Sequence, residues 1–368
     1  MNLGWDEKKM LNIARDEENK VGEQMDEMLA IVLSCPKFPE GRTVAIVPME
    51  ENRGSGSDIA DKINEELKKS GLDDIKIGSL AFDTTAKNSG VKNGAAVLFQ
   101  RKFVGKEVLY LACRHHIFEI VLSVVWEFYM GKTKSSKDTF CNKVAKEFAD
   151  INTDTEFQIL SSSCFSQPYL QNMRTKTIHL LTALLTNPNS KEQIPRDDYR
   201  EAIELCLVML GCPPPRWQEQ TRWLKCGATS NARWMHTMLY APKAYAFGDK
   251  FSFVDDETQQ KLQDFLVYSS LIHSRHWVTS SWGSDAAVLD LQFFQEILNL
   301  SESYPELSEK ILSRWNGRHT WYLSEENLPL VFCSRLLDED KKDRLAARLL
   351  TFERVNPLSL EKPKLTSN

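Results

Sequence analysis

The sequence predicts a mixed α/β sheet followed by a large all-helical region, and three observations carry this prediction. Short β-rich runs alternate with helical patterns over the first 130 residues. From about residue 139 to 310 one helical pattern follows another. The composition, with 42% hydrophobic and 26% charged residues, is that of a folded globular protein. A chain of 368 residues has room for two or three folding units.

The first part of the chain favours the element order βββαβαβα. Strands are expected at 2–12, 27–35 and 43–49, and then an amphipathic helix at 57–70 that Ser57 or Asp58 would cap. A strand at 75–83, a helix near 93–103, a strand at 107–113 and a helix from about 115 to 130 follow. Three strands in succession and then alternating helices and strands indicate a mixed sheet flanked by helices.

The polar, basic stretch GKTKSSKD at 131–138 indicates a linker, and helices dominate after it. They are expected at 139–150, 167–187, 197–211, 231–247, 255–272 and 286–300. The segment 307–315, a turn at Asn316-Gly317, a helical stretch at 325–336 and a charged helix at 338–351 come next. We therefore expect a sheet-bearing core at 1–130, a helical insertion at 131–310, the last part of the core at 311–355 and a flexible tail at 356–368.

Charge and hydropathy exclude several classes of protein. A net charge of −5 means that any nucleic-acid contact would use local patches, because the average surface does not attract a polyanion. No apolar run approaches the roughly 18 residues that a membrane span needs, so no membrane partner is expected. The first residues, MNLGWDEKKM, lack the pattern of a secretory signal. Eight dispersed cysteines fit a reducing compartment. We expect a nuclear or cytoplasmic protein that is not secreted.

Two aspartates stand on predicted strands that should be neighbours. Asp6 lies in WDEKK on the first strand, and Asp83 ends the fourth strand in LAFDTTAKNSG. Their carboxylates would converge at one sheet edge, where hard oxygen ligands suit Mg²⁺ or Mn²⁺. A third carboxylate is available in YLSEENLPL as Glu325 or Glu326. The alternative is that each aspartate only shapes a turn and that the glutamates only begin a helix.

Two further motifs leave alternatives open. Cys113 and His116 form a C-x-x-H pair in LACRHHIFEIVL, which is either half of a zinc site or simple packing at a strand end. Three Arg-Trp pairs stand at 216–217, 222–223 and 233–234. These pairs would either stack on nucleic-acid bases or bury their tryptophans beside extended arginines.

These motifs together resemble the hAT transposase superfamily and its domesticated animal relatives. The family has a D-x-x-x-x-N run shortly before a C-x-x-H motif, which Asp83, Asn88, Cys113 and His116 match. An Arg-Trp motif within the helical insertion is similar to Arg233-Trp234. The resemblance covers roughly residues 1–352, although it is strong only in short stretches.

The resemblance implies an RNase H-like core with a DDE triad, interrupted by a large helical insertion before the last acid. Asp6 would be the first member of the triad, Asp83 the second and Glu326, in preference to Glu325, the third. The implied cofactor is a pair of Mg²⁺ or Mn²⁺ ions, with no small-molecule cofactor, and the implied reaction is cleavage or strand transfer of DNA phosphodiesters.

The resemblance implies DNA as a partner, and it allows a second copy of the chain as another. Candidate nucleic-acid contacts are Arg222, Trp223, Arg233 and Trp234. Transposases of this type carry an amino-terminal zinc-finger domain and a carboxy-terminal dimerisation segment, whereas this sequence starts almost on the first strand, which favours a truncated or co-opted relative. The alternative function is therefore a catalytically inactive, domesticated transposase that binds nucleic acid or protein.

Overall fold

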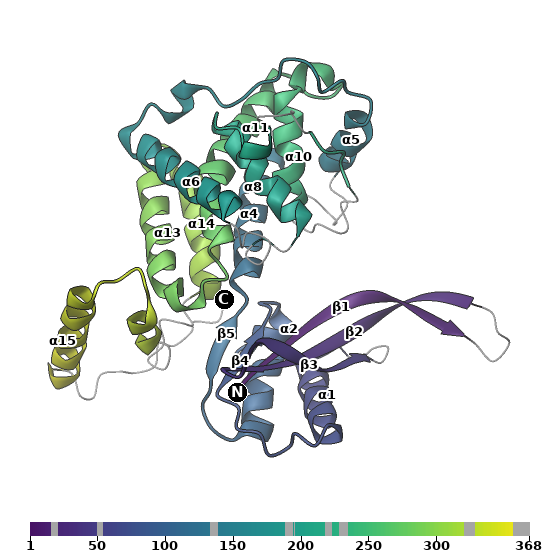
Figure 1. Cartoon of the computed structure of the whole chain (residues 1–368), viewed down its shortest axis with the longest axis vertical. Coiled ribbons are helices and arrows are strands. Elements are labelled where there is room, and N and C mark those ends of the chain that lie inside the picture. The colour runs from purple at the N-terminus through teal and green to yellow at the C-terminus, as the bar shows by residue number, and fades with distance from the viewer. Residues whose placement is uncertain are drawn as a thin grey trace.

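The computed structural model describes residues 1–15, 21–49, 54–132, 139–187, 194, 196–217, 223–227, 235–319 and 328–355. Within these residues it shows a five-stranded sheet and a separate helical part, joined where β5 runs into α4 (Figure 1). The mixed α/β class and the order βββαβαβα predicted for the first part are confirmed.

The sheet has the strand order β3-β2-β1-β4-β5. Its strands are β1 (Asn2–Arg15), β2 (Val21–Cys35), β3 (Phe38–Pro48), β4 (Ser79–Phe82) and β5 (Leu109–Ala112). β2 pairs antiparallel with both β1 and β3, whereas β1, β4 and β5 run parallel. The first and fourth strands therefore lie side by side, as the sequence predicted.

Alternation along the strands gives the sheet one apolar face. Leu3 and Trp5 of β1 are buried, and Trp5 stacks on Phe82 of β4 with ring centroids 5.3 Å apart. Helices α1 (Gly56–Lys69) and α3 (Ala95–Phe99) supply the other half of this core. A short helix, α2 (Ala86–Ser89), and a π-helical turn at Gln100–Val104 complete the sheet part. Residues i and i+2 share a face of a strand, so Leu3, Trp5 and Glu7 lie on the core face of β1.

The cap of α1 differs from the prediction. Ser55, and neither Ser57 nor Asp58, is the N-cap residue. The backbone N–H of Asp58 donates to the Ser55 hydroxyl at 3.3 Å, and the backbone N–H of Ser55 donates to the Asp58 carboxylate at 3.1 Å. This is a capping box, and it starts the helix one residue earlier than the apolar pattern alone indicates.

The helical part has its own core, to which α4 (Arg114–Met130) contributes side chains from Ile117 to Trp126. The remaining helices are α5 (Thr139–Phe148), α6 (Pro168–Thr186), α8 (Asp197–Met209), α10 (Met235–Ala246), α11 (Asp256–Tyr268), α12 (Ser274–Val278), α13 (Ala286–Leu300), α14 (Pro305–His319) and α15 (Glu339–Val355). A π-helical turn at Ser269–His273 joins α11 to α12, and a 3-10 turn spans Leu328–Cys333. The predicted helical insertion is thus helical throughout its described elements.

Two features near the end of the chain differ from the prediction. The turn expected at Asn316-Gly317 is wrong, because α14 continues to His319. Burial of Leu307, Ile311 and Trp315 along one side of this helix outweighs the roughly 1 kcal/mol that an interior glycine costs. The predicted helix at 325–336 is a 3-10 turn over its described part. No described helix is long and apolar enough to cross a membrane.

Candidate active site at the carboxyl end of the sheet

The two predicted aspartates stand at equivalent places on neighbouring parallel strands. β1 and β4 pair through Gly4 and Ala81, and two residues further along each strand are Asp6 and Asp83. Asp6 is exposed, and Asp83 is half-buried. Asp6 and Asp83 therefore lie level with each other just beyond the point where the parallel pairing of β1 with β4 stops, although β1 itself continues to Arg15.

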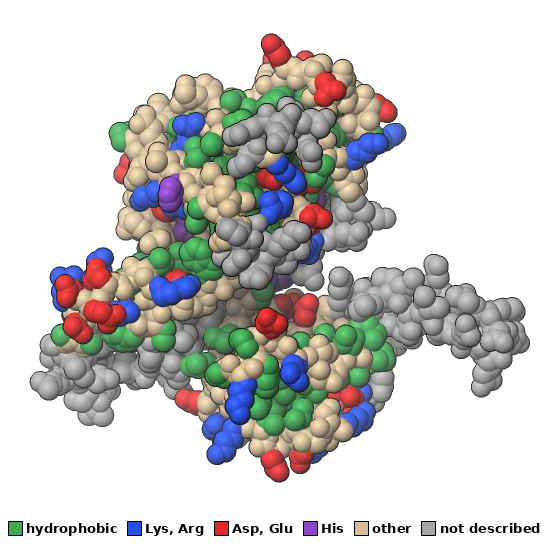
Figure 2. All heavy atoms as spheres, viewed as in Figure 1, with side chains coloured by type: hydrophobic (Ala, Val, Ile, Leu, Met, Phe, Trp, Pro, Cys, Tyr) green, Lys and Arg blue, Asp and Glu red, His purple; other side chains and the backbone are tan. Residues whose placement is uncertain are grey.

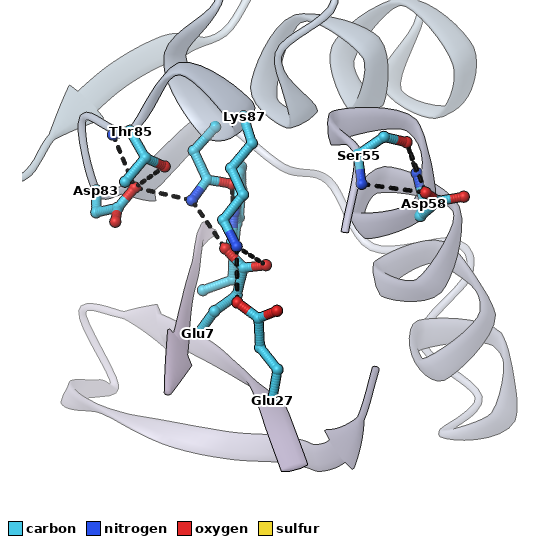
Figure 3. A network of polar contacts seen from close by, with 9 residues as sticks. Glu7, Glu27, Ser55, Asp58, Asp83, Thr85 and Lys87 are labelled. Carbon is cyan, nitrogen blue, oxygen red and sulfur yellow. Dashed lines mark hydrogen bonds and ion pairs between the residues drawn. The ribbon is translucent and has the colours of Figure 1, made fainter. Parts of the chain in front are cut away.

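Asn88 on α2 is the centre of the polar network around Asp83 (Figure 3). Its side chain is almost completely buried. The amide nitrogen donates to Asp83 Oδ1 at 2.8 Å and to Glu7 Oε2 at 3.3 Å, and the amide oxygen accepts from the Trp5 indole at 2.8 Å. Every polar atom of this amide has a partner, so the D-x-x-x-x-N spacing fixes where the Asp83 carboxylate points.

Asp83 is held in its ionised form. The backbone N–H and the hydroxyl of Thr85 donate to Asp83 Oδ1 at 3.0 and 2.7 Å. Burial works to raise the pKa of Asp83, but the hydrogen bonds from Asn88 and Thr85 and the nearby charge of His116 outweigh it, so the pKa lies below its ordinary value. All of these hydrogen bonds reach Oδ1, which leaves Oδ2 as the carboxylate oxygen without a hydrogen bond from the described part of the chain.

A buried carboxylate that the sequence did not reveal lies next to Asp6. Glu7 is on the core face of β1, and Lys87 Nζ lies 2.8 Å from its Oε1 and 2.8 Å from Glu27 Oε1 (Figure 3). Burial raises the pKa of Glu7, and the hydrogen bond and charge of Lys87 offset only part of this effect. The available signal was an acid that follows Leu3 and Trp5 at a spacing of two residues on the predicted strand, because an acid on the same face as two apolar residues needs a partner.

The C-x-x-H pair lies beside both aspartates, at the junction of β5 and α4. The pKa of the Cys113 thiol is raised, first because surrounding protein removes water from it and also because of the negative charges of Glu119 and Asp6. The charge of His116 has the opposite effect on Asp83 and lowers the pKa of its carboxyl group. Asp6 and Asp83 are therefore within electrostatic range of the same short segment. In the space-filling view, acidic side chains gather where the sheet part meets the helical part (Figure 2).

The described residues hold no group of three or more His, Cys, Asp and Glu side chains that could bind a metal ion. The third predicted acid, Glu325 or Glu326, lies outside the described residues. The structure thus brings Asp6 and Asp83 to one edge with Cys113 and His116, and it supplies no complete metal-ligand set from its described part.

The one candidate nucleic-acid residue that the structure describes is in the protein core. Trp223 packs against Trp217, Phe247 and Phe157 with ring centroids 5.1 to 5.2 Å apart, and it is 9% exposed. Its ring is therefore covered by protein and presents no face to a base. Arg216 forms an ion pair with the buried Glu204. The other candidates, Arg222, Arg233 and Trp234, lie outside the described residues.

Replacing Asn88 with alanine is expected to lower the free energy of unfolding by roughly 2–4 kcal/mol. The substitution leaves the Trp5 indole N–H and the Glu7 carboxylate with one partner fewer in a buried place, and hydrogen bonds to charged groups are worth more than neutral ones. Urea unfolding at pH 7 measures the loss. Asn93→Ala, at an exposed position after α2, is the matched control, and an equal loss in both variants would contradict this description.

Comparison of the chain with models of known protein families found no match, and comparison with curated protein sequences found none either.

Proposed function

We propose that this chain is a transposase-derived protein with an RNase H-like core that cleaves or transfers DNA phosphodiesters with the help of divalent metal ions. The observation that carries the proposal is that Asp6 and Asp83 stand level with each other on neighbouring parallel strands, just beyond the last paired residues, Gly4 and Ala81. The sequence resemblance supports it, because the strand order β3-β2-β1-β4-β5 is compatible with the fold that the resemblance implies.

The carboxylates present fit Mg²⁺ or Mn²⁺. Both ions prefer hard oxygen ligands and keep several waters and substrate phosphates, so a site that offers few protein oxygens is suitable. Asp6 is exposed. The hydrogen bonds that Asp83 accepts from Thr85 and Asn88 all reach its Oδ1. A pair of such ions, when bound, lowers the pKa of the attacking water and neutralises charge on the leaving oxygen.

The residues of this chain have separable tasks in that proposal. Asp6 and Asp83 bind the ions, and Asn88 and Thr85 hold Asp83 ionised and fixed in direction. The third ligand is Glu326, with Glu325 as the alternative. These glutamates and the 3-10 turn at Leu328–Cys333 are close in sequence, so whatever anchors that turn limits where the glutamates can be.

The 3-10 turn is anchored to the same part of the helical domain that contacts the start of α4. The Ser334 hydroxyl and the Arg335 backbone N–H both donate to Asp285 Oδ1 at 2.8 Å. Further along, Asp290 forms a buried ion pair with Arg114, which directly follows Cys113. The chain just after the glutamates is therefore linked through two buried aspartates to the edge that carries Asp83, which supports a shared site.

A catalytically inactive relative that binds nucleic acid or protein is the second candidate. The specific observations in its favour are the acidic balance of the chain, with a net charge of −5, and the lack of a complete metal-ligand group among the described residues. The ionised and oriented state of Asp83 favours the first candidate, because an unused carboxylate does not need three neighbouring residues, Asn88, Thr85 and His116, to define its charge and direction.

The experiment that separates them is nicking of supercoiled DNA by the purified protein with Mn²⁺. We expect nicking that requires Mn²⁺ and that falls at least about 100-fold in Asp83→Asn, because loss of a ligand should exceed the 10–100-fold loss typical of an outer-sphere group. Asp74→Asn, exposed at the opposite end of β4, is the matched control and should nick like the wild type. Nicking that survives Asp83→Asn, or its absence from the wild type, would remove the enzymatic proposal.

A further inference from the structure

The first turn of α8 packs against the start of α4, next to the candidate site. His115 stacks on Tyr199 with ring centroids 6.4 Å apart, and it meets Trp277 edge-on at 5.3 Å. Tyr199 and Trp277 are themselves 4.6 Å apart in an edge-to-face arrangement. Since His115 lies between Cys113 and His116, this aromatic cluster joins the helical part to the C-x-x-H segment.

Arg196 covers the outer side of this cluster. Its guanidinium lies over the Tyr199 ring, 4.5 Å from the centroid, and its side chain is 48% exposed. Its ion pair is with Asp198, which is also partly exposed. A guanidinium that rests on an aromatic ring keeps its second face and outer N–H groups available for a planar or anionic ligand.

Backbone pairing attaches this stack to the edge of the sheet that carries Asp83. The negative charge of Asp6 reaches Cys113, and Cys113 in turn influences Tyr199. Glu119, in the first turns of α4, influences both Tyr199 and Arg196. The backbone N–H of Cys113 donates to the carbonyl oxygen of Phe82 at 2.8 Å, so Cys113 lies next to Asp83, and His115, two residues further on, leads from there to Tyr199 and Arg196.

Other cations around the site are engaged more tightly. Lys87 bridges the carboxylates of Glu7 and Glu27. Arg114 is buried and pairs with the fully buried Asp290. Arg196 differs because its pair with Asp198, which uses Nε and Nη2, lies at the surface, where a phosphate can compete with the carboxylate for the guanidinium.

We propose that Arg196, supported by Tyr199, binds a backbone phosphate of the DNA strand whose phosphodiester is presented to Asp6 and Asp83. This inference rests on the proposed function and adds a substrate-binding residue from the helical part to it. The chemistry is that of an arginine fork on a phosphate, oriented by an aromatic ring beneath it. A metal-bound phosphodiester at the carboxylates would leave the neighbouring phosphates of the same strand unneutralised, and Arg196 supplies a positive charge on that side.

The test is the affinity of the whole chain for a fluorescein-labelled single-stranded oligonucleotide, measured by anisotropy over a range of NaCl concentrations without divalent ions. Arg196→Ala is expected to raise the Kd about tenfold and to reduce the slope of log Kd against log salt by roughly 0.7. Arg196→Lys keeps the charge and should restore the slope. Arg101→Ala, exposed in the π-helical turn that precedes β5, is the matched control and should bind like the wild type.

The binding and nicking results together distinguish a failure of the role of Arg196 from a failure of the proposed function. Wild-type affinity and slope in Arg196→Ala, with Mn²⁺-dependent nicking intact in the wild type, would overturn the role of Arg196 and leave the proposed function standing. A wild-type chain that binds no DNA and does not nick would overturn both. Equal losses in Arg196→Ala and Arg101→Ala would show a general charge effect and would also overturn the inference.

Discussion

Replacing Arg114 with methionine is expected to lower the free energy of unfolding by about 3–5 kcal/mol, because it leaves the Asp290 carboxylate buried without its partner. Arg114 Nη2 lies 2.5 Å from Asp290 Oδ1, and both side chains are buried. Arg114 Nη1 also donates to the backbone oxygens of Thr279 and Ser280 at 3.3 and 3.0 Å. One substitution therefore removes an ion pair and the donor for two buried carbonyl groups.

Urea unfolding measures this loss, and the double variant Arg114→Met with Asp290→Leu provides the internal check. A buried pair replaced on both sides by apolar groups often costs little, so the double variant should recover much of the stability that the single variant loses. Arg101→Met, at an exposed position in the π-helical turn Gln100–Val104, is the control for removing an arginine. A double variant less stable than the single one would contradict the explanation.

The same ion pair has a consequence for the candidate site. Arg114 is the first residue of α4 and lies between Cys113 and His116, in the segment whose first residue pairs with the end of β4 beside Asp83. The helical part thus fixes the start of α4 through α13, and the carboxyl end of the sheet is held through that start. Loss of Arg114 should therefore affect metal affinity as well as stability.

Acid is expected to destabilise the helical part through His273. This residue lies in the π-helical turn Ser269–His273, is fully buried between Phe118 and Tyr268, and has no hydrogen-bond partner for either ring nitrogen in the described part of the chain. Burial, together with the charge of His276, lowers the pKa of His273 from 6.5 to about 3. The neutral ring is therefore the form that the folded core accepts.

The direction of the pH effect on stability follows from which state of the chain binds the proton. Between pH 6.5 and about 3 the unfolded chain takes up a proton at His273 that the folded chain does not, so stability is complete above pH 6.5 and falls as the pH drops. The loss is about 1.4 kcal/mol per pH unit, or roughly 2 kcal/mol at pH 5. Urea unfolding at pH 7.5 and 5 should show His273→Met gaining on the wild type by this amount, with His179→Met, at an exposed place on α6, as the control. A stability difference that does not change with pH would contradict it.

The order of elements was predictable because each carries its own periodicity, but the lengths of the first two strands were not. Strands were expected at 2–12 and 27–35, whereas β1 and β2 pair with each other from Asn2 and Ser34 out to Arg15 and Val21. They form a two-stranded ribbon that extends beyond the rest of the sheet (Figure 1). Pairing of this kind is set by backbone hydrogen bonds between two segments, which alternation within either segment does not report.

In the candidate site, strand order was enough to predict that Asp6 and Asp83 lie on neighbouring strands, and the register of β1 and β4 in the structure sets the two residues level. It was not enough to find Glu7, Lys87 and Glu27, whose contact joins residues distant in sequence. The role of Asn88 was implied only by resemblance, and its three hydrogen bonds now give that spacing a physical reason. The burial of Trp223 depends on the packing of four aromatic rings, which spacing alone does not determine.

The convergence of three acids on one divalent ion site is most directly tested by iron-directed cleavage of the protein backbone. Fe²⁺ replaces Mg²⁺ at oxygen sites, and with ascorbate and peroxide it cuts the chain next to where it is bound. We predict cuts beside Asp6, Asp83 and residues 325–326, all suppressed by excess Mg²⁺ and all lost in Asp83→Asn. Cuts at only one of these three places, or cuts that persist in Asp83→Asn, would contradict a shared site.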